Sequence, residues 1–351
     1  MKEKIEQIIE AAIRAPSGDN VQPWKLDIAG NNQVDLFNLP ERDPSYFNYK
    51  QMASYIAHGA LIENFMIAAK TLGCMVELSL FPSSDNPNHV AQFKLTETEA
   101  EPDPLYPAIF KRQTDRNRFK STPLTQIQIE NLKSSTSSIK QATLNLITNK
   151  EQKDRLAWLL QNNDRLVFEH KAIHKFLFEQ IRWTQEEVET SQDGMPTETL
   201  GLNPIERFLF PAFKQWKTVK FFNSLMLSRV IGLKGWFNCR TSSALGLITI
   251  KENNPLGFLS AGRATQRVWL QATLDGLSFQ PVTGLFFLFQ RAKGSNLEGF
   301  SQKQIQLIQK TKIDLQQLYG YKNDIPAMGF RIGGRCKPIG EPLTKRIRWT
   351  K

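Results

Sequence analysis

Two segments that lie far apart in the chain carry the same helical pattern. GALIENFMIAAKTLG covers residues 59–73, and GRATQRVWLQATLDG covers residues 262–276. When they are aligned, three pairs of small residues coincide and the apolar positions between them stay in register: Gly59/Gly262, Ala69/Ala272 and Gly73/Gly276. Each segment ends on glycine, a common helix terminator. Taken by themselves, these segments could also be two unrelated buried helices that end in glycine. An internal repeat is indicated only if the elements around the two segments recur as well.

The flanking elements also recur in the same order. Residues 2–15 have helical spacing, WKLDIA and QVDLF alternate as strands, a mostly apolar helix covers about 51–72, and MVELSLF is typical of a buried strand. Later, PLTQIQIENL predicts a helix, QATLNLIT and SALGLITI predict strands, and residues 257–275 predict a helix. The sequence therefore predicts two fused α+β repeats, residues 1–105 and 106–351, the second carrying a C-terminal extension.

A segment of about residues 151–240 interrupts the second repeat and has no counterpart in the first. It is predominantly helical, rich in Phe and Trp, and divided by the loop SQDGMPTETLGLNP. From Pro204 to Arg240 it has seven Lys or Arg residues and one acid, Glu206, a net six of the chain's formal charge of +11. Helices of this kind more often cover a core, so we expect no nucleic-acid partner and at most weak contact with a membrane surface.

Two polar segments stand out as candidate binding elements. In APSGDNVQPW, Gly18, Asp19 and Asn20 lie on a loop between helix and strand, where tight turns bring backbone amides close to a ligand; alone, it is also an ordinary turn. In KRQTDRNRF, three arginines surround Thr114, a set that suits a phosphate group. A solvated basic turn is the alternative for this second segment.

Other signals carry less weight. His170 and His174 are four residues apart, and without a third ligand they fit a surface pair better than a metal site. The sequence shows neither a dinucleotide-binding nor a P-loop glycine pattern after a strand. Three scattered cysteines, a charged N-terminal helix and no run of about 20 apolar residues favour a cytoplasmic protein with unpaired thiols.

The motifs resemble those of the nitroreductase superfamily. P-S-x-x-N-x-Q-P-W is matched in residues 16–24, the phosphate motif R-x-[ST]-x-[RK] in residues 112–116, and the P-x-E-G turn in residues 281–284, with Thr283 replacing the usual acid. LPERDP, GALIEN, SAGRATQRVWLQAT and PAMGFRIG extend the resemblance to the single-chain, double-repeat Acg-like branch. The resemblance implies a pseudo-dimer with mixed, mostly antiparallel sheets flanked by helices.

The resemblance also implies one complete FMN cleft, because each motif occurs once; FAD stays open as the cofactor. The residues that would hold the flavin come from the four motif regions: Pro16, Ser17, Gly18, Asn20, Arg112, Thr114, Arg116, Pro281, Thr283, Gly284, Lys345 and Arg346. Lys345 and Arg346 match a Lys/Arg pair that similar proteins supply near the C-terminus. No catalytic side chain and no metal is expected.

The function implied is hydride transfer from NAD(P)H through flavin N5 to a nitroaromatic, a quinone or a similar acceptor. The alternative is a protein that sequesters or stores FMN under a closed lid with little turnover. The aromatic insertion would form that lid over the flavin through Phe208, Phe210, Phe213, Trp216, Phe221, Phe222, Trp236 and Phe237. A monomer is expected, because two fused repeats already supply both halves of the usual dimer.

Overall fold

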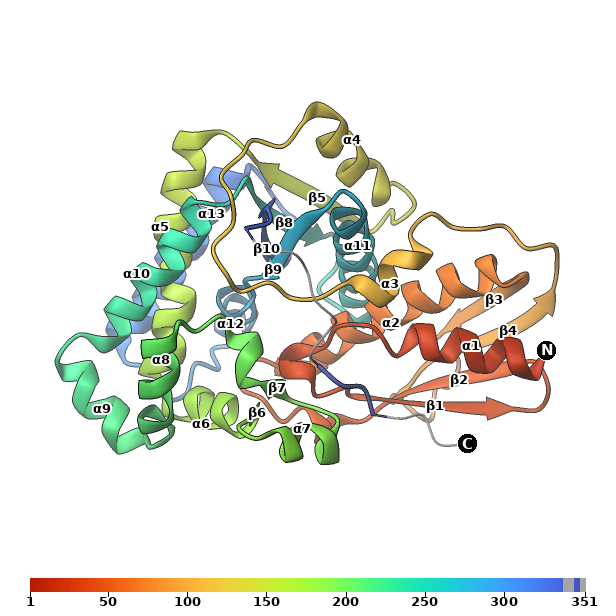
Figure 1. Ribbon diagram of the computed structural model, residues 1–351, viewed down its shortest axis with the longest axis horizontal. Helices are drawn as coiled ribbons and strands as arrows, with labels where there is room; N and C mark the ends of the chain where they lie inside the picture. The colour runs from red at the N-terminus through yellow and green to blue at the C-terminus, as the bar shows by residue number, and fades with distance from the viewer. Residues whose placement is uncertain (337–343, 348–351) are drawn as a thin grey trace.

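Two four-stranded sheets with the same strand order form the framework of the computed structural model, which describes residues 1–336 and 344–347 (Figure 1). The first has the order β1-β2-β4-β3 and the second β5-β8-β10-β9. All neighbouring strands in both sheets are antiparallel. The expected mixture of strand directions comes instead from a separate short parallel pair, β6 (Ile181–Arg182) with β7 (Met195–Pro196).

The order of elements repeats along the chain. The first repeat contains α1 (Lys2–Ala12), β1 (Trp24–Ala29), β2 (Gln33–Asn38), α2 (Met52–Thr71), β3 (Cys74–Leu80) and β4 (His89–Glu97). The second contains α4 (Gln126–Ser135), β5 (Ala142–Ile147), β8 (Ala244–Ile250), α11 (Pro255–Leu274), β9 (Leu277–Pro281) and β10 (Ile325–Gly334). The predicted α+β class with two fused repeats is confirmed, while the boundary at 105/106, just before α3 (Tyr106–Lys111), stays a prediction.

One strand differs from its expected environment, and one was missed. MVELSLF forms β3 but is not buried: it is an edge strand, its residues alternate between faces, and Met75 is 64% exposed. Its neighbour β4 was not predicted, although VAQFKL alternates in the way a half-buried strand does. An edge position exposes one face of β3, which explains why its apolar residues are not all in the core.

The helices α2 and α11 cross in close contact, and the repeated glycines lie at the crossing. A Cβ atom on Gly262 would lie 2.0 Å from the Ile56 carbonyl oxygen and 3.0 Å from the Gly59 Cα. A Cβ atom on Gly59 would lie 2.0 Å from the Leu259 carbonyl oxygen. No side chain fits at either position without moving backbone, so the repeat first seen in the sequence marks the contact between the two halves.

Polar side chains next to the glycines reproduce the two-fold relation. Glu63 is buried and accepts hydrogen bonds from Arg263 Nε at 2.8 Å and Arg267 Nη1 at 2.6 Å. Gln266, which aligns with Glu63, donates to Asn64 Oδ1 at 2.7 Å. Asn64 aligns in turn with Arg267. Glu63 thus bonds to Arg267 of the other repeat, and Gln266 bonds to Asn64, so each of these charged and amide side chains has a partner.

The second repeat carries two insertions at places where the first has short turns. Between β5 and β8, where residues 30–32 join β1 to β2, lie six helices and the β6/β7 pair: α5 (Lys150–Glu169), α6 (Lys171–Glu179), α7 (Gln185–Ser191), α8 (Pro204–Leu209), α9 (Trp216–Ser224) and α10 (Leu227–Arg240). Between β9 and β10 lie α12 (Gly284–Lys293) and α13 (Gln302–Tyr319). Of the helices in the described residues, none has the length and apolarity needed to span a bilayer.

Substituting Gly262→Ala should destabilise the whole chain, because the new methyl group meets helix backbone rather than a flexible side chain. Overpacking of this kind costs about 1–3 kcal/mol or more in the free energy of unfolding. Gly18→Ala is the control, since nothing lies within 4 Å of its built Cβ. Urea unfolding measures both; equal midpoints for the two variants would show that the helices do not need this close approach.

Candidate functional site

The loop between α1 and β1 has an unusual backbone, held by its own side chains. Asp19, Asn20 and Gln22 all have positive φ, of 46°, 60° and 52°. The backbone N–H of Gln22 donates to Ser17 Oγ at 2.9 Å, which closes the loop. Non-glycine residues are uncommon in this conformation and gather at ligand-binding sites. The segment predicted from its Pro16–Asn20 motif is therefore a preformed structure rather than a simple turn.

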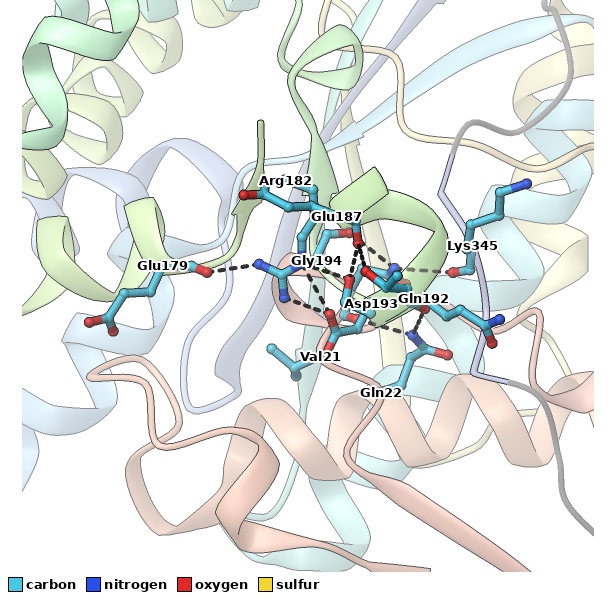
Figure 2. Close-up of polar contacts among 12 residues, drawn as sticks. Val21, Gln22, Glu179, Arg182, Glu187, Gln192, Asp193, Gly194 and Lys345 are labelled. Atoms are coloured by element: carbon cyan, nitrogen blue, oxygen red, sulfur yellow. Dashed lines mark hydrogen bonds and ion pairs between the residues drawn. The ribbon is translucent and has the colours of Figure 1, made fainter. Parts of the chain in front are cut away.

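The C-terminal segment meets this loop, as the sequence prediction requires. Arg346 Nη1 donates to Asn20 Oδ1 at 2.9 Å, and Asn20 Nδ2 donates to the Lys345 carbonyl at 3.2 Å. The Ile347 amide donates to Gln22 Oε1 at 2.9 Å. Lys345 itself is exposed and its amine points away from the loop (Figure 2). Of the predicted Lys/Arg pair, only Arg346 directs its charge to the site.

Arg112 is the most deeply buried of the predicted arginines. It follows α3, is 6% exposed, and stacks on the Trp269 ring of α11 at 4.5 Å. Its Nη2 donates to the Arg14 carbonyl at 3.0 Å, and Arg346 Nη2 reaches the same oxygen at 3.4 Å. Two guanidinium groups from distant parts of the chain therefore converge on one backbone oxygen.

Within residues 1–336 and 344–347, these two guanidinium groups have no negative partner. No ion pair joins either of them to a carboxylate within the described part of the chain, and the Nε atoms of both are buried without a hydrogen-bond partner there. Burial, with the nearby charge of Arg346, lowers the pKa of Arg112 to about 9, and burial, with Arg14, lowers that of Arg346 to about 10. Positive charge is concentrated where an anion would relieve it.

Arg116 has a different environment from Arg112. It donates to the Thr199 carbonyl at 3.0 Å and contacts Met195 Sδ at 3.3 Å, both in the insertion. Burial lowers its pKa, while the carboxylates of Asp19 and Asp164 act in the opposite direction. Thr114, between the two arginines, is half-buried. The predicted phosphate motif thus contains one arginine without a carboxylate partner in the described ranges and one with two carboxylates nearby.

The turn at residues 281–284 lies against the insertion. Pro281 ends β9 and Thr283 precedes α12, where its carbonyl accepts from the Phe286 amide at 2.9 Å. The Leu285 amide donates to Asn163 Oδ1 of α5 at 3.1 Å, and a Cβ on Gly284 would lie 2.9 Å from the same oxygen. Asn163 also donates to Asp164, which acts on Arg116. Residues 163–164 therefore connect the turn to the arginine motif.

A polar turn of the insertion covers the residue 16–22 loop (Figure 2). Gln22 Nε2 donates to the Gln192 carbonyl at 2.9 Å, and Asn20 Nδ2 donates to the Gly194 carbonyl at 3.1 Å. Arg182 holds the turn by donating to Asp193, and Arg42 contacts the same carboxylate at 3.5 Å. Sequence reasoning missed these residues; the Gly and Pro content of residues 191–204 indicated a loop, but not its target.

The expected aromatic lid is not what the structure shows. Phe208 and Phe221 are 84% and 62% exposed, and Phe222 and Phe237 are also exposed. Phe210, Phe213 and Trp216 pack in a small cluster of the insertion with Phe178 and Val219. The cover over the loop is therefore polar, because the segment that reaches it is the turn at 192–194 and not the Phe-rich helices.

The two histidines of the insertion are buried, so their interpretation as a surface pair is wrong. His170 Nδ1 accepts from the Ile173 amide, which caps α6, and its Nε2 lies 2.9 Å from the Glu298 carbonyl. His174 Nε2 lies 2.9 Å from the Phe213 carbonyl. Both rings are used in packing and capping. Across the described residues, no three His, Cys, Asp or Glu side chains gather in a group suited to a metal.

A surface groove of about 700 Å³ lies elsewhere, between α5, α10 and α13. Its lining includes Trp158, Trp236, Arg240 and Lys310, and none of the predicted cofactor-binding residues is among the lining residues that the structure describes. The candidate site is thus the covered region around Asn20, Arg112 and Arg346, and not this groove.

Comparison with known proteins gives distant relatives. No family model matches the sequence. An uncharacterised protein of Mycobacterium tuberculosis is 24% identical over 326 residues, which is 89% of this chain and 43% of that protein. A protein of the same organism with the provisional name NAD(P)H nitroreductase acg is 30% identical over 122 residues, 34% of this chain and 37% of that protein. The chain spans less than half the length of the curated relatives it matches.

Solved structures that carry nitroreductase names are less similar to this chain in sequence than the relatives above. The FMN-dependent nitroreductase NfnB from Mycobacterium smegmatis, in complex with NADPH, is 11% identical with a TM-score of 0.36, covering 65% of this chain and 86% of that one. A nitroreductase with bound FMN from Desulfitobacterium hafniense is 9% identical with a TM-score of 0.34, covering 69% and 94%. At these TM-scores neither protein indicates a function for this chain.

Asp19 should make stability depend on pH. Burial is the main cause that raises its pKa from 3.8 to about 6, with Arg116 opposing and Asp43 adding to the shift. The folded state therefore holds a proton that the unfolded state releases, so stability falls as pH rises from about 4 to 6 and stays lower above that range.

Asp19→Asn should remove this fall in stability with rising pH. We expect the variant to be more stable than the parent at pH 7.5, by roughly 1–3 kcal/mol in the free energy of unfolding, and close to it at pH 4. Urea unfolding at several pH values measures the difference, with the exposed Asp85→Asn as control. Parallel curves for parent and Asp19→Asn would show that the carboxyl is already ionised in the folded state.

Proposed function

We propose that this chain, a sequence relative of the nitroreductase superfamily, binds one FMN at the covered site and acts as an NAD(P)H oxidoreductase. The observation that carries the proposal is the pair of buried Arg112 and half-buried Arg346, which have positive charge, buried Nε donors without a partner and no carboxylate partner among the described residues. A phosphate group would supply the missing negative charge and accept from these donors.

The residues around this pair divide the work of holding such a cofactor. Arg112 and Arg346 would bind the phosphate, and Asn20 positions Arg346 through its 2.9 Å hydrogen bond. Arg116 would act at longer range, because Asp19 and Asp164 offset its charge and its guanidinium is engaged by Met195 and Thr199. Ser17 keeps the loop in shape through the Gln22 amide.

When bound, FMN supplies the hydride-transfer chemistry between NAD(P)H and an acceptor such as a nitroaromatic or a quinone. The chain would contribute binding, orientation and exclusion of water, and no side-chain acid is assigned to the reaction. At the turn of residues 281–284, Thr283 cannot act as a carboxylate, and Asn163 already accepts from the Leu285 amide. This turn would therefore act through backbone and shape.

A second candidate function is FMN sequestration with little turnover. The turn at 192–194 favours it, because two carbonyls of that turn accept from Gln22 and Asn20, and Asp193 is held by Arg182. Anaerobic addition of excess NADH or NADPH separates the two candidates: bleaching of the bound flavin supports the oxidoreductase, and persistent yellow colour supports sequestration. We further propose a cytoplasmic monomer, since the α2/α11 contact already joins two repeats within one chain.

Arg112→Gln together with Arg346→Gln should remove most of the flavin. Each charge-assisted hydrogen bond to a phosphate contributes about 1.5–3 kcal/mol, so the double variant should bind FMN at least about a hundredfold more weakly. The measurement is the flavin released on denaturation of purified protein, identified by mass and absorbance, which also distinguishes FMN from FAD.

The control for this experiment is Arg118→Gln, an exposed arginine of the same segment that stacks on Phe237. It should keep its flavin. Full occupancy in a folded Arg112/Arg346 double variant would place the phosphate elsewhere, and loss of flavin from the Arg118 variant would point to a general effect of charge.

Removing the anchor of the 192–194 turn should open the site. Asp193→Ala breaks the contacts with Arg182 and Arg42, so flavin exchange should become several-fold faster while FMN still binds. Arg240→Gln is a matched control, because it breaks an ion pair of the same insertion, with Asp154, away from the loop. Equal exchange rates in the two variants and the parent would show that the turn does not limit access.

A further inference from the structure

The outer surface of the insertion is apolar over three helices, α8, α9 and α10. Five side chains there are more than half exposed besides Phe208 at 84%: Ile205 at 72%, Leu225 at 64%, Phe221 and Val230 at 62%, and Met226 at 57%. Large exposed apolar side chains scattered singly are ordinary on protein surfaces, but a group of this kind marks a site of interaction.

The helix α10 shows that the exposure is directional. Val230, Leu233 and Phe237 follow the i, i+3, i+7 spacing of one helix face and are all exposed, as is Met226 at the N-cap. The opposite face carries Ser228, Gly232 and Cys239, which are buried; at Gly232 a Cβ would lie 3.0 Å from the Gln161 carbonyl of α5. Small residues therefore line the buried face, Ile231 and Trp236 pack at its sides, and a second set of large apolar residues faces outward.

Contacts between the helices make these residues one surface. Lys234 of α10 pairs with Glu206 of α8, and the Phe222 ring of α9 lies 5.7 Å from Phe213, in the turn between α8 and α9. In Figure 1, α8, α9 and α10 occupy the end of the molecule away from the β1–β4 sheet. We call this set of helices, residues 204–240, the outer surface.

The same segment holds an excess of positive charge. It has seven Lys or Arg residues and one acid, Glu206. Within the part of the chain that the structure describes, ion pairs engage Lys234, with Glu206, and Arg240, with Asp154. The other five have no recorded carboxylate partner among those residues: Arg207, Lys214, Lys217, Lys220 and Arg229.

We propose that the outer surface docks on an anionic lipid bilayer, lying in the headgroup region without crossing it. Phe, Leu, Ile and Met side chains beside Lys and Arg are the composition of helices that bind membrane surfaces. Anionic headgroups complement the five cations that have no carboxylate partner among the described residues, and the acyl boundary accepts the apolar side chains. The inference goes beyond the proposed function, because it needs neither flavin nor the Arg112/Arg346 site.

Two other occupants fit the surface less well. A second copy of the chain, paired through the same surface, would bring two sets of like charges together. A nucleic acid would match the charge but would leave Ile205, Leu225 and Val230 without apolar contact. A bilayer satisfies both properties of the surface at once.

The test is co-sedimentation of the full chain with vesicles of phosphatidylcholine alone and of phosphatidylcholine mixed with phosphatidylglycerol. We expect binding to the mixed vesicles, weakening as salt rises, and little binding to the neutral ones. Lys217→Gln with Lys220→Gln should weaken binding roughly thirtyfold, and Phe208→Ser with Val230→Ser should weaken it more than about tenfold. Because all four residues are exposed, unchanged thermal unfolding should accompany both losses.

Matched controls replace similar residues elsewhere on the surface. Met75→Ser with Ile127→Ser removes two exposed apolar side chains, and Lys94→Gln with Lys133→Gln removes two exposed cations, without touching residues 204–240. Both should bind as the parent does. The proposal is overturned if the parent fails to bind mixed vesicles, if the controls lose as much affinity as the test variants, or if light scattering shows a dimer that the outer-surface variants abolish while vesicle binding stays unchanged.

Discussion

The close approach of α2 and α11 is the constraint on which the rest of the structure depends. Gly59 and Gly262 allow the two helix backbones to touch, and Glu63, Arg263 and Arg267 then partner their charges beside the contact. A buried carboxylate with two guanidinium partners is stable only when the geometry holds all three together. The glycine crossing supplies that geometry, and the two sheets are placed by the helices that meet there.

The candidate site follows from this crossing. The helix α1 packs on α2, where Asn64 donates to the Ala11 carbonyl at 3.2 Å, so the end of α1 and the Arg14 carbonyl are fixed relative to the crossing. The helix α3 packs on both α2 and α11, and Arg112 at its end stacks on Trp269. Arg14 and Arg112 come from opposite sides of the predicted repeat boundary, yet they meet because both are tied to the same pair of helices.

Much of this arrangement could be predicted from the sequence, and the failures have specific causes. The matching positions of Gly59 and Gly262 in two aligned helical segments identified the repeat, because helix periodicity and close packing both leave a pattern in the sequence. Asn20, Arg112 and Arg346 were predicted from motifs and do come together. The different environments of Arg112 and Arg116 could not be predicted, since they depend on Asp19 and Asp164, which neighbour Arg116 only in the folded chain. Burial of His170 and His174 was missed because tertiary packing, not local spacing, decides it.

The insertion explains how a pseudo-symmetric framework comes to have two unlike halves. It replaces the turn of residues 30–32 in the first repeat, so a single copy of the covering turn, with Asp193 and Gly194, reaches the single loop that carries Asn20. Its helices α8, α9 and α10 carry the exposed apolar side chains of the outer surface, whereas α5 and α6 bury several of theirs. One segment thus has two chemically different sides: a polar turn that hydrogen-bonds to the candidate site, and a basic, apolar surface that faces away. The turn over the site and the helices of the outer surface are neighbours in sequence, joined by residues 195–203.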